Sequence, residues 1–185
     1  GPGGLGISSF AVVQDGQEIT PEWEAIESIE ISILSDQAED SSIRLKFNGW
    51  KVGDETIDVE WTISTLWDAR WVKHTLQFPK GFDQELHLGA TQYLEEYSKD
   101  EARAMIHGLG DQTYKKVKPR RLLTALKGDP RTFAGFFTEG KNVGLIARPD
   151  EAGRAVFYAS ASWAAEPSPL FLEEDWPAKL FQGID

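Results

Sequence analysis

Three histidines, His74, His87 and His107, are the residues best suited to proton transfer or metal binding, because imidazole titrates near neutral pH and ligates transition metals. They lie 13 and 20 residues apart, and neither a His-x-Glu nor a His-Glu-x-x-His pattern occurs. The chain also has no cysteine, so thiolate ligands are absent. We therefore expect structural roles for the histidines, no metal site and no cofactor.

Catalytic and phosphate-binding motifs are also missing from the sequence. No Gly-x-Ser-x-Gly pattern is present, no Gly-x-Gly-x-x-Gly pattern occurs after residue 6, and the glycines Gly108 and Gly110 fit a helix cap followed by a turn. Carboxylates are too abundant in this acidic chain for any pair to indicate acid–base chemistry. No catalytic residue is predicted, and the sequence leans away from an enzyme.

Aromatic side chains are a second candidate, because four of the seven tryptophans fall within 22 positions. Trp61 alternates with apolar residues and belongs to the expected core. Trp67 and Trp71 flank a probable turn, where exposed rings would suit a protein interface or a sugar ring. The competing interpretation is a large aromatic core.

A basic stretch at residues 114–121 stands out, because residues 114–131 carry seven basic residues and one acidic residue. A helix beginning near Pro119 would present free amide N–H groups beside these cations and so suit a phosphate. Neutralisation of the acidic remainder of the chain is the competing interpretation, and nucleic acid is a third. The candidate anion-binding residues are Lys115, Lys116, Lys118, Arg120 and Arg121.

The acidic residues are concentrated at the start of the chain, where residues 1–60 hold 13 acidic and 3 basic residues. Glu30, Asp58 and Glu60 fall on the polar side of expected strands, opposite the apolar side. They form a candidate face for a basic partner, and Trp67 and Trp71 would add affinity. A solvated face that serves only solubility is the alternative.

Strict alternation of apolar and polar residues predicts the sheet that would carry this face. Three runs alternate cleanly, and a one-residue slip in any of them would expose its apolar side chains, so we expect one shared core. Further strands are expected at residues 7–14, 71–78, 132–138, 143–148 and 155–163. The residues predicted to face the core are Ile29, Ile31, Ile33, Ile43, Leu45, Phe47, Ile57, Val59, Trp61 and Ile63.

The middle of the chain reads as helical. Residues 98–101 have capping-box spacing before a helix at 102–107 that ends at Gly108, and residues 119–127 form a second helix that ends at Gly128. Residues 20–23 resemble a short helix start, and the tail from residue 164 reads as irregular with one helical turn. Strands, then helices, then strands predict an α+β fold with a mainly antiparallel sheet.

Length and composition limit the kinds of protein to which this chain can belong. The chain has 185 residues, 41% of them apolar, and a net charge of −11. Residues 1–4 resemble a tag remnant, and residues 5–185 suit a single domain. An apolar run long enough for a transmembrane helix is missing, so no membrane partner is expected. A cytoplasmic location fits the lack of cysteine, although a removed leader is compatible with this chain.

These features favour a non-enzymatic acidic protein that docks a basic protein partner, as inhibitor, immunity-type or adaptor proteins do. Its negative charge disfavours nucleic acid. The alternative is a small enzyme or ligand-binding protein with an anion pocket at Lys118, Arg120 and Arg121, in which His74 or His87 moves protons. Oligomeric state is not predicted.

Overall fold

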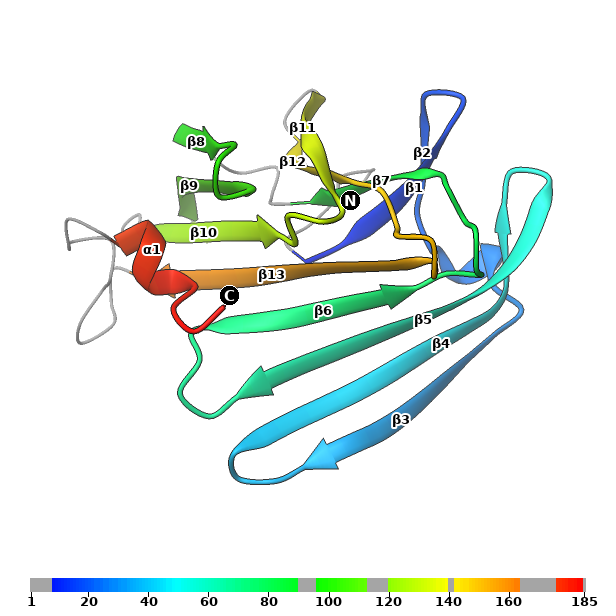
Figure 1. Cartoon of the computed structure of the whole chain (residues 1–185), viewed down its shortest axis with the longest axis horizontal. Helices are drawn as coiled ribbons and strands as arrows, with labels where there is room; N and C mark the ends of the chain where they lie inside the picture. Colours follow the sequence, from blue (N-terminus) through cyan, green and yellow to red (C-terminus); the bar gives the residue numbers. More distant parts are fainter. Residues whose placement is uncertain (1–7, 90–95, 113–119, 140–141, 164–175, 185) are drawn as a thin grey trace.

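The computed structural model describes residues 8–89, 96–112, 120–139, 142–163 and 176–184, and these form an almost entirely antiparallel β-structure (Figure 1). The antiparallel sheet was predicted, but the α+β class was wrong. The elements are β1 Phe10–Gln14, β2 Gln17–Ile19, the 3₁₀ turn Trp23–Ala25, β3 Ser28–Asp36, β4 Asp40–Val52, β5 Glu55–Leu66, β6 Trp71–Gln77, β7 Glu85–Gly89, β8 Glu96–Asp100, β9 Met105–Gln112, β10 Arg120–Gly128, β11 Phe133–Glu139, β12 Asn142–Ala147, β13 Arg154–Trp163 and α1 Trp176–Leu180.

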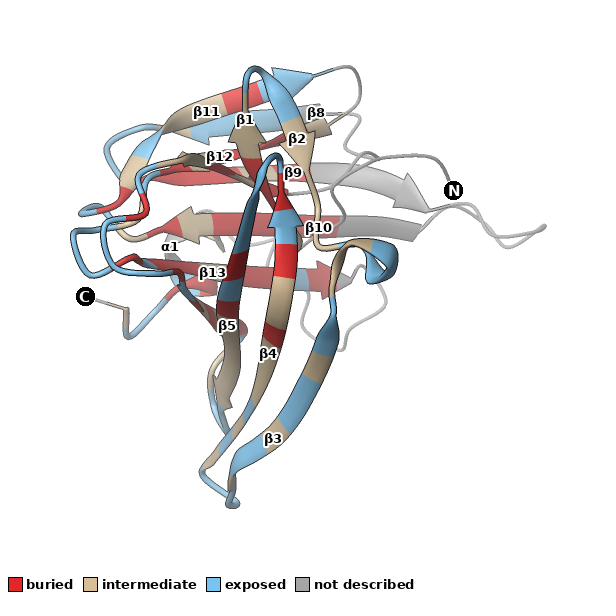
Figure 2. Cartoon of the chain, turned by 90° about the vertical axis from the view of Figure 1, so that its right-hand side faces the viewer, coloured by how far each residue is buried: buried red, intermediate tan, exposed pale blue. Residues whose placement is uncertain are grey.

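The strands form two sheets. The larger has eight strands in the order β3-β4-β5-β6-β13-β10-β9-β8, and the smaller has five in the order β11-β12-β7-β1-β2. The smaller sheet lies over β6, β13 and β10 and over the ends of β4 and β5 that adjoin their connecting turn, whereas β3 and the other ends of β4 and β5 extend away from it (Figures 1 and 2). The larger sheet therefore has a covered part and a projecting part.

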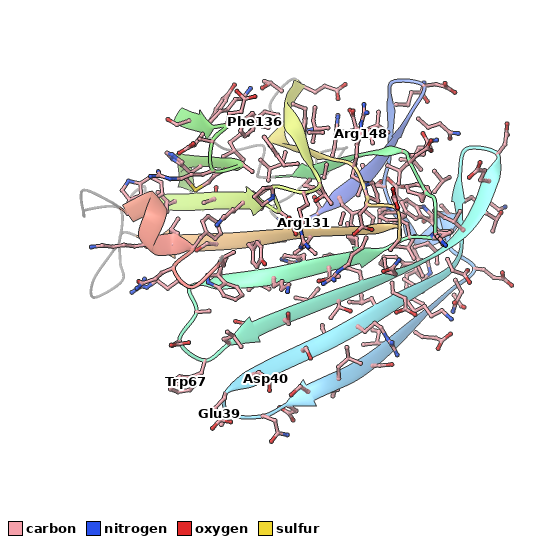
Figure 3. All side chains as sticks on the ribbon, viewed as in Figure 1. Glu39, Asp40, Trp67, Arg131, Phe136 and Arg148 are labelled. Atoms are coloured by element: carbon pink, nitrogen blue, oxygen red, sulfur yellow. The ribbon has the colours of Figure 1, made fainter. Side chains whose placement is uncertain are left out.

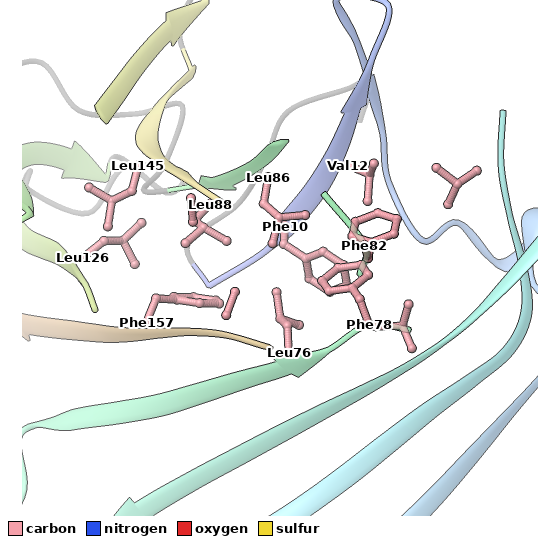
Figure 4. Close-up of a cluster of buried hydrophobic side chains, with 14 of the residues drawn as sticks. Phe10, Val12, Leu76, Phe78, Phe82, Leu86, Leu88, Leu126, Leu145 and Phe157 are labelled. Carbon is pink, nitrogen blue, oxygen red and sulfur yellow. The ribbon is translucent and has the colours of Figure 1, made fainter. Parts of the chain in front are cut away.

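The main core fills the space between the two sheets (Figure 4). Leu86 and Leu88 alternate with His87 along β7, so their side chains point toward the larger sheet, where they join Leu76 and Phe157. All four of these leucine and phenylalanine side chains are fully buried. Burial of such side chains stabilises the fold by about 1.5–3 kcal/mol each.

A second apolar cluster lies on the opposite face of the larger sheet, beneath α1. Leu180 and Phe181 pack against Trp71 and against Leu123 of β10. Leu126, which lies on the other face of β10 from Leu123, belongs to the main core between the sheets. Strand β10 is thus buried on both faces.

This double burial explains why the predicted helix at residues 119–127 was wrong. A strand buried on both sides carries an almost continuous apolar run, which periodicity does not distinguish from a buried helix. Pairing with two neighbours decides the outcome, since β10 forms antiparallel ladders with β9 and β13 along most of its length.

The predicted helix at residues 102–107 is also absent, because this segment is a hairpin between β8 and β9. The backbone N–H of Arg103 donates to Oδ1 of Asp100 at 3.1 Å, and Ala104 adopts a positive φ of 49°. The polar residues that resemble a capping box therefore stabilise a tight turn instead, as Asp and Ser do in many turns.

The remaining local predictions agree better with the structure. Strands occupy most of the five further predicted ranges, a short 3₁₀ turn follows residue 22, and α1 supplies the helical turn of the tail. The suggested tag remnant at residues 1–4 lies outside the described residues.

Candidate protein-binding surface

The projecting part of the larger sheet exposes an apolar face. Ile31 and Ile33 of β3 are 70% and 72% exposed, and Ile43 of β4 is 39% exposed. Exposed single hydrophobic residues are ordinary, but these three lie on adjacent strands, because Ile33 pairs directly with Ile43. We call Ile31, Ile33 and Ile43 the apolar ledge.

Cross-strand pairing shows that the ledge is a continuation of the core. One row runs from Ile31 through Leu45 and Trp61 to Leu76, and exposure falls along it from 70% at Ile31 to zero at Leu76. Figure 2 shows the same gradient, with β3 largely exposed. The smaller sheet does not extend over the outer end of this row, so the predicted common face is present but incompletely covered.

The prediction that ten apolar residues share one core therefore needs correction at its edge. Phe47, Ile57 and Val59 are buried as expected, and Trp61 and Ile63 are half-buried. The ledge residues and, partly, Ile29 are not enclosed. The alternation pattern specifies which face a side chain occupies, and it contains no information about how far the opposing layer extends.

On the polar face of the same strands, the pairing register places basic and acidic side chains next to one another. Lys46 of β4 pairs with both Glu30 of β3 and Glu60 of β5, and so lies between the two carboxylates. The guanidinium of Arg44 lies 3.5 Å from the carboxylate of Glu60, and Asp58 accepts a hydrogen bond from the backbone N–H of Gly49 at 2.9 Å. The predicted set Glu30, Asp58 and Glu60 therefore belongs to a mixed-charge face, of which Glu30 lies on the edge strand.

A more strongly acidic surface lies at the far end of the projection, where the β3–β4 and β5–β6 turns meet. Trp67 is 85% exposed, and its backbone N–H donates to the carbonyl oxygen of Glu39 at 3.0 Å. Figure 3 places Trp67, Glu39 and Asp40 together at this end. Asp36 and Asp68, in the same two turns, are also exposed. We call Asp36, Glu39, Trp67 and Asp68 the acidic tip.

Trp71, the other tryptophan predicted to be exposed, is only 9% exposed. Its indole N–H donates to the carbonyl oxygen of Gln182 at 3.1 Å, and its ring meets Tyr158 edge-on at 5.4 Å. The C-terminal segment that covers Trp71 is 111 residues away in sequence, so position near a turn did not indicate this burial.

The basic stretch offers less support for an anion site than its sequence suggests. Lys115, Lys116 and Lys118 lie outside the described residues. Arg120 and Arg121 begin strand β10, where they pair with Gln112 and Asp111 of β9 in an antiparallel ladder. The argument from free N–H groups at a helix start is therefore wrong, because there is no helix at that place.

His74 is enclosed in the core, not placed in a site. Its Nδ1 accepts a hydrogen bond from the Trp61 indole at 3.2 Å, and its ring stacks on Phe157 at 4.6 Å. Burial lowers the pKa of His74 from 6.5 to about 4. His107 meets Trp176 edge-on at 4.6 Å, and burial lowers its pKa as well, although Asp100 opposes the shift. The core role expected for His74 agrees with this environment, while His107 lies in β9 and not in a helix.

A pocket of about 580 Å³ lies between the β5–β6 turn and the C-terminal segment, lined by polar and apolar groups that include Asp68, Arg70, Lys179 and Gln182. Among the described residues that line this pocket there is no histidine, so neither His74 nor His87, the residues proposed to move protons, contributes to it.

Comparison with known proteins identifies no relative, since no family model, curated protein or solved structure matches the chain. Among the described residues, no helix is long and apolar enough to cross a membrane.

Proposed function

We propose that this protein is a non-enzymatic binding protein that docks a basic partner protein on the projecting part of its larger sheet. The apolar ledge carries the proposal, because it exposes neighbouring isoleucines in continuity with the core. The acidic tip and the charge of the whole chain define the chemistry of the partner.

The ledge would supply affinity. Complete burial of an isoleucine side chain is worth about 1.5–3 kcal/mol, so covering the ledge would offset part of the entropy lost on association. Trp67 adds a large exposed aromatic ring at the tip, and aromatic residues are enriched among those that dominate binding energy.

Charge would supply the rate and the selectivity of association. The net charge of −11 attracts positively charged proteins over a distance set by salt, and the exposed carboxylates of Asp36, Glu39 and Asp68 concentrate that field at the tip. A second copy of the chain is disfavoured as the occupant by the same charge. A basic partner is complementary.

Strand β3 also provides a backbone edge. It is nine residues long, and among the described strands it pairs with β4 alone, so its other edge can accept an added strand. A segment pairing there would place alternate side chains beside Ile31 and Ile33 and the others beside Glu30. An extended segment that alternates apolar and basic residues fits both sides.

The test uses a synthetic peptide of alternating Val and Lys, with an alternating Val and Glu peptide for comparison, titrated into the full chain. We expect only the basic peptide to bind, with an affinity that falls as salt rises, and with slowed amide exchange in β3. The double variant Ile31→Glu/Ile33→Glu should lose binding. The matched control is Tyr97→Ser, since Tyr97 is 41% exposed on β8, the opposite edge strand of the same sheet.

Equal binding of the two peptides, or binding that survives in the Ile31→Glu/Ile33→Glu variant, would refute this docking surface. Light scattering on each sample separates partner binding from self-association. A dimer that dissociates in the same double variant would identify a second copy as the occupant and overturn the proposal.

A further inference from the structure

The smaller sheet brings together three potential metal ligands that are far apart in sequence. Glu18 of β2, His87 of β7 and Glu139 of β11 each place one ligand atom within 4.8 Å of the other two. The closest pair is Nδ1 of His87 and Oε1 of Glu18, at 2.6 Å. All three side chains lie on the face of the smaller sheet opposite the core residues Leu86 and Leu88.

Carboxylates outnumber cations around this imidazole. Besides Glu18 and Glu139, Glu85 has Oε1 at 3.6 Å from Nε2 of His87, and the other oxygen of Glu85 is 3.5 Å from the guanidinium of Arg148. Arg148 pairs with Glu85. Among the described residues gathered here, Glu18 and Glu139 then share the imidazole of His87, which carries at most one positive charge.

The histidine is also held in a fixed orientation. The ring of Phe137 stacks on it at 4.0 Å with an angle of 4° between the planes. Gly144 leaves room for the Phe137 ring, which lies over it. A Cβ atom at Gly144 would overlap this ring and the carbonyl oxygen of Leu88. The side chain of His87 is only 12% exposed and that of Glu18 only 20%. Two of the three ligands are thus positioned by packing, which lowers the cost of binding an ion.

We propose that Glu18, His87 and Glu139 form a binding site for a divalent transition metal ion, of which Zn²⁺ fits the donor set best. One imidazole nitrogen and two carboxylate oxygens are donors that zinc accepts, and a fourth position would remain open to water. Nδ1 of His87 is the ligand atom. Nε2–H then faces Glu85, in the arrangement of a ligating histidine with an outer carboxylate.

The geometry requires an adjustment of both carboxylates. Zinc bonds of about 2.0–2.2 Å place tetrahedral ligand atoms about 3.3 Å apart. The Glu18 carboxylate must therefore withdraw from Nδ1 by less than about 1 Å, and the Glu139 oxygen must approach by no more than about 1.5 Å, since the three ligand atoms lie within 4.8 Å of one another. The ion would take the place of the direct contact between His87 and Glu18. This site revises the expectation of no metal, which rested on spacing along the chain and not on neighbours across the sheet.

The experiment is calorimetric titration of the full, chelator-treated chain with ZnCl₂. We expect one ion per chain at pH 7.5. His87→Gln should abolish stoichiometric binding, and Glu139→Gln should weaken it at least ten-fold. His107→Gln, in the larger sheet, is the matched control and should bind zinc as the unaltered chain does.

Glu139 is exposed, so its variant keeps the test decisive even where His87→Gln fails to fold. Absence of one-to-one binding at pH 7.5, or unchanged affinity in Glu139→Gln, would overturn the site. The inference does not depend on the proposed partner, because the ledge and the tip lie on the other sheet and the zinc titration needs no peptide.

Discussion

The covered and the projecting parts of the larger sheet have the same alternating sequence pattern but different surroundings. In β6, β13 and β10 the inner face meets the smaller sheet, and the outer face is partly covered by α1 and the C-terminal segment. At Ile31 and Ile33 of β3 and Ile43 of β4 the same kind of inner face is exposed. The proposed docking surface rests on this difference.

The largest expected effect compares two members of one cross-strand row. Leu76→Ala should lower the free energy of unfolding by about 2–5 kcal/mol, because it leaves a cavity in the core. Ile31→Ala, at the exposed end of the row, should cost less than about 1 kcal/mol. Urea unfolding of both variants measures the difference. A comparable loss in Ile31→Ala would mean that the ledge is covered in the free protein.

The second effect depends on pH and concerns the next cross-strand row, which runs from Ile33 on the edge strand β3 to His74 in the covered strand β6. Burial lowers the pKa of His74 to about 4, so between pH 6.5 and 4 the unfolded chain binds a proton that the native protein does not. Stability should therefore decrease as the pH falls through this window, by up to about 3 kcal/mol. His74→Phe should remove that contribution from the pH dependence of urea unfolding.

Ile33→His provides the control for this titration, because it places an imidazole in the same row at its uncovered end. A solvated imidazole has similar pKa values in the folded and unfolded chains, so no added pH dependence is expected. We compare how steeply the free energy of unfolding changes with pH. The same pH dependence in Ile33→His and in the unaltered chain, combined with a weaker one in His74→Phe, would sharpen the contrast between the two regions. An unaltered slope in His74→Phe would contradict it.

The third effect concerns the rate of association with the Val–Lys peptide. The triple variant Asp36→Lys/Glu39→Lys/Asp68→Lys should slow association at least about ten-fold at low salt, because it reverses the field at the tip. Glu30→Lys/Asp58→Lys/Glu60→Lys changes the net charge equally but should slow association less, since Lys46 and Arg44 already lie among those carboxylates. Stopped-flow fluorescence compares the two. Equal association rates in the two variants would mean that the net charge alone, and not its position at the tip, controls association.

The smallest effect is expected for the ion pair on the polar face. Arg44 and Glu60 are each 39% exposed with 3.5 Å between their charged atoms, so the pair contributes little in water. Arg44→Ala should change the free energy of unfolding by less than about 1 kcal/mol, measured in urea. A larger loss would indicate that the polar face of the projection is covered, as the covered part of the sheet is.

Much of the strand structure could be predicted, because alternation reports on a local property. Residues two apart in a strand share a face whatever lies opposite, and so Ile29, Ile31 and Ile33 were assigned to the correct side. The Asp15-Gly16 pair forms the tight turn between β1 and β2 for a similarly local reason, since both residues adopt a positive φ, whereas Asn48-Gly49 lies at a bulge within β4. The predictions failed where a segment is buried on both sides, as in β10, and where turn residues imitate a helix cap, as at Asp100.

The sequence by itself determined the alternating faces, the acidic first third and the absence of motifs for known chemistry, since each of these depends on residues near one another in the chain. Tertiary structure alone decided which apolar residues remain uncovered, because this depends on where the smaller sheet ends. Register placed Lys46 between Glu30 and Glu60, and sheet order brought Glu18, His87 and Glu139 together from three strands. Contacts between residues up to 121 positions apart are set by the packing of whole sheets, and no local pattern in the chain encodes them.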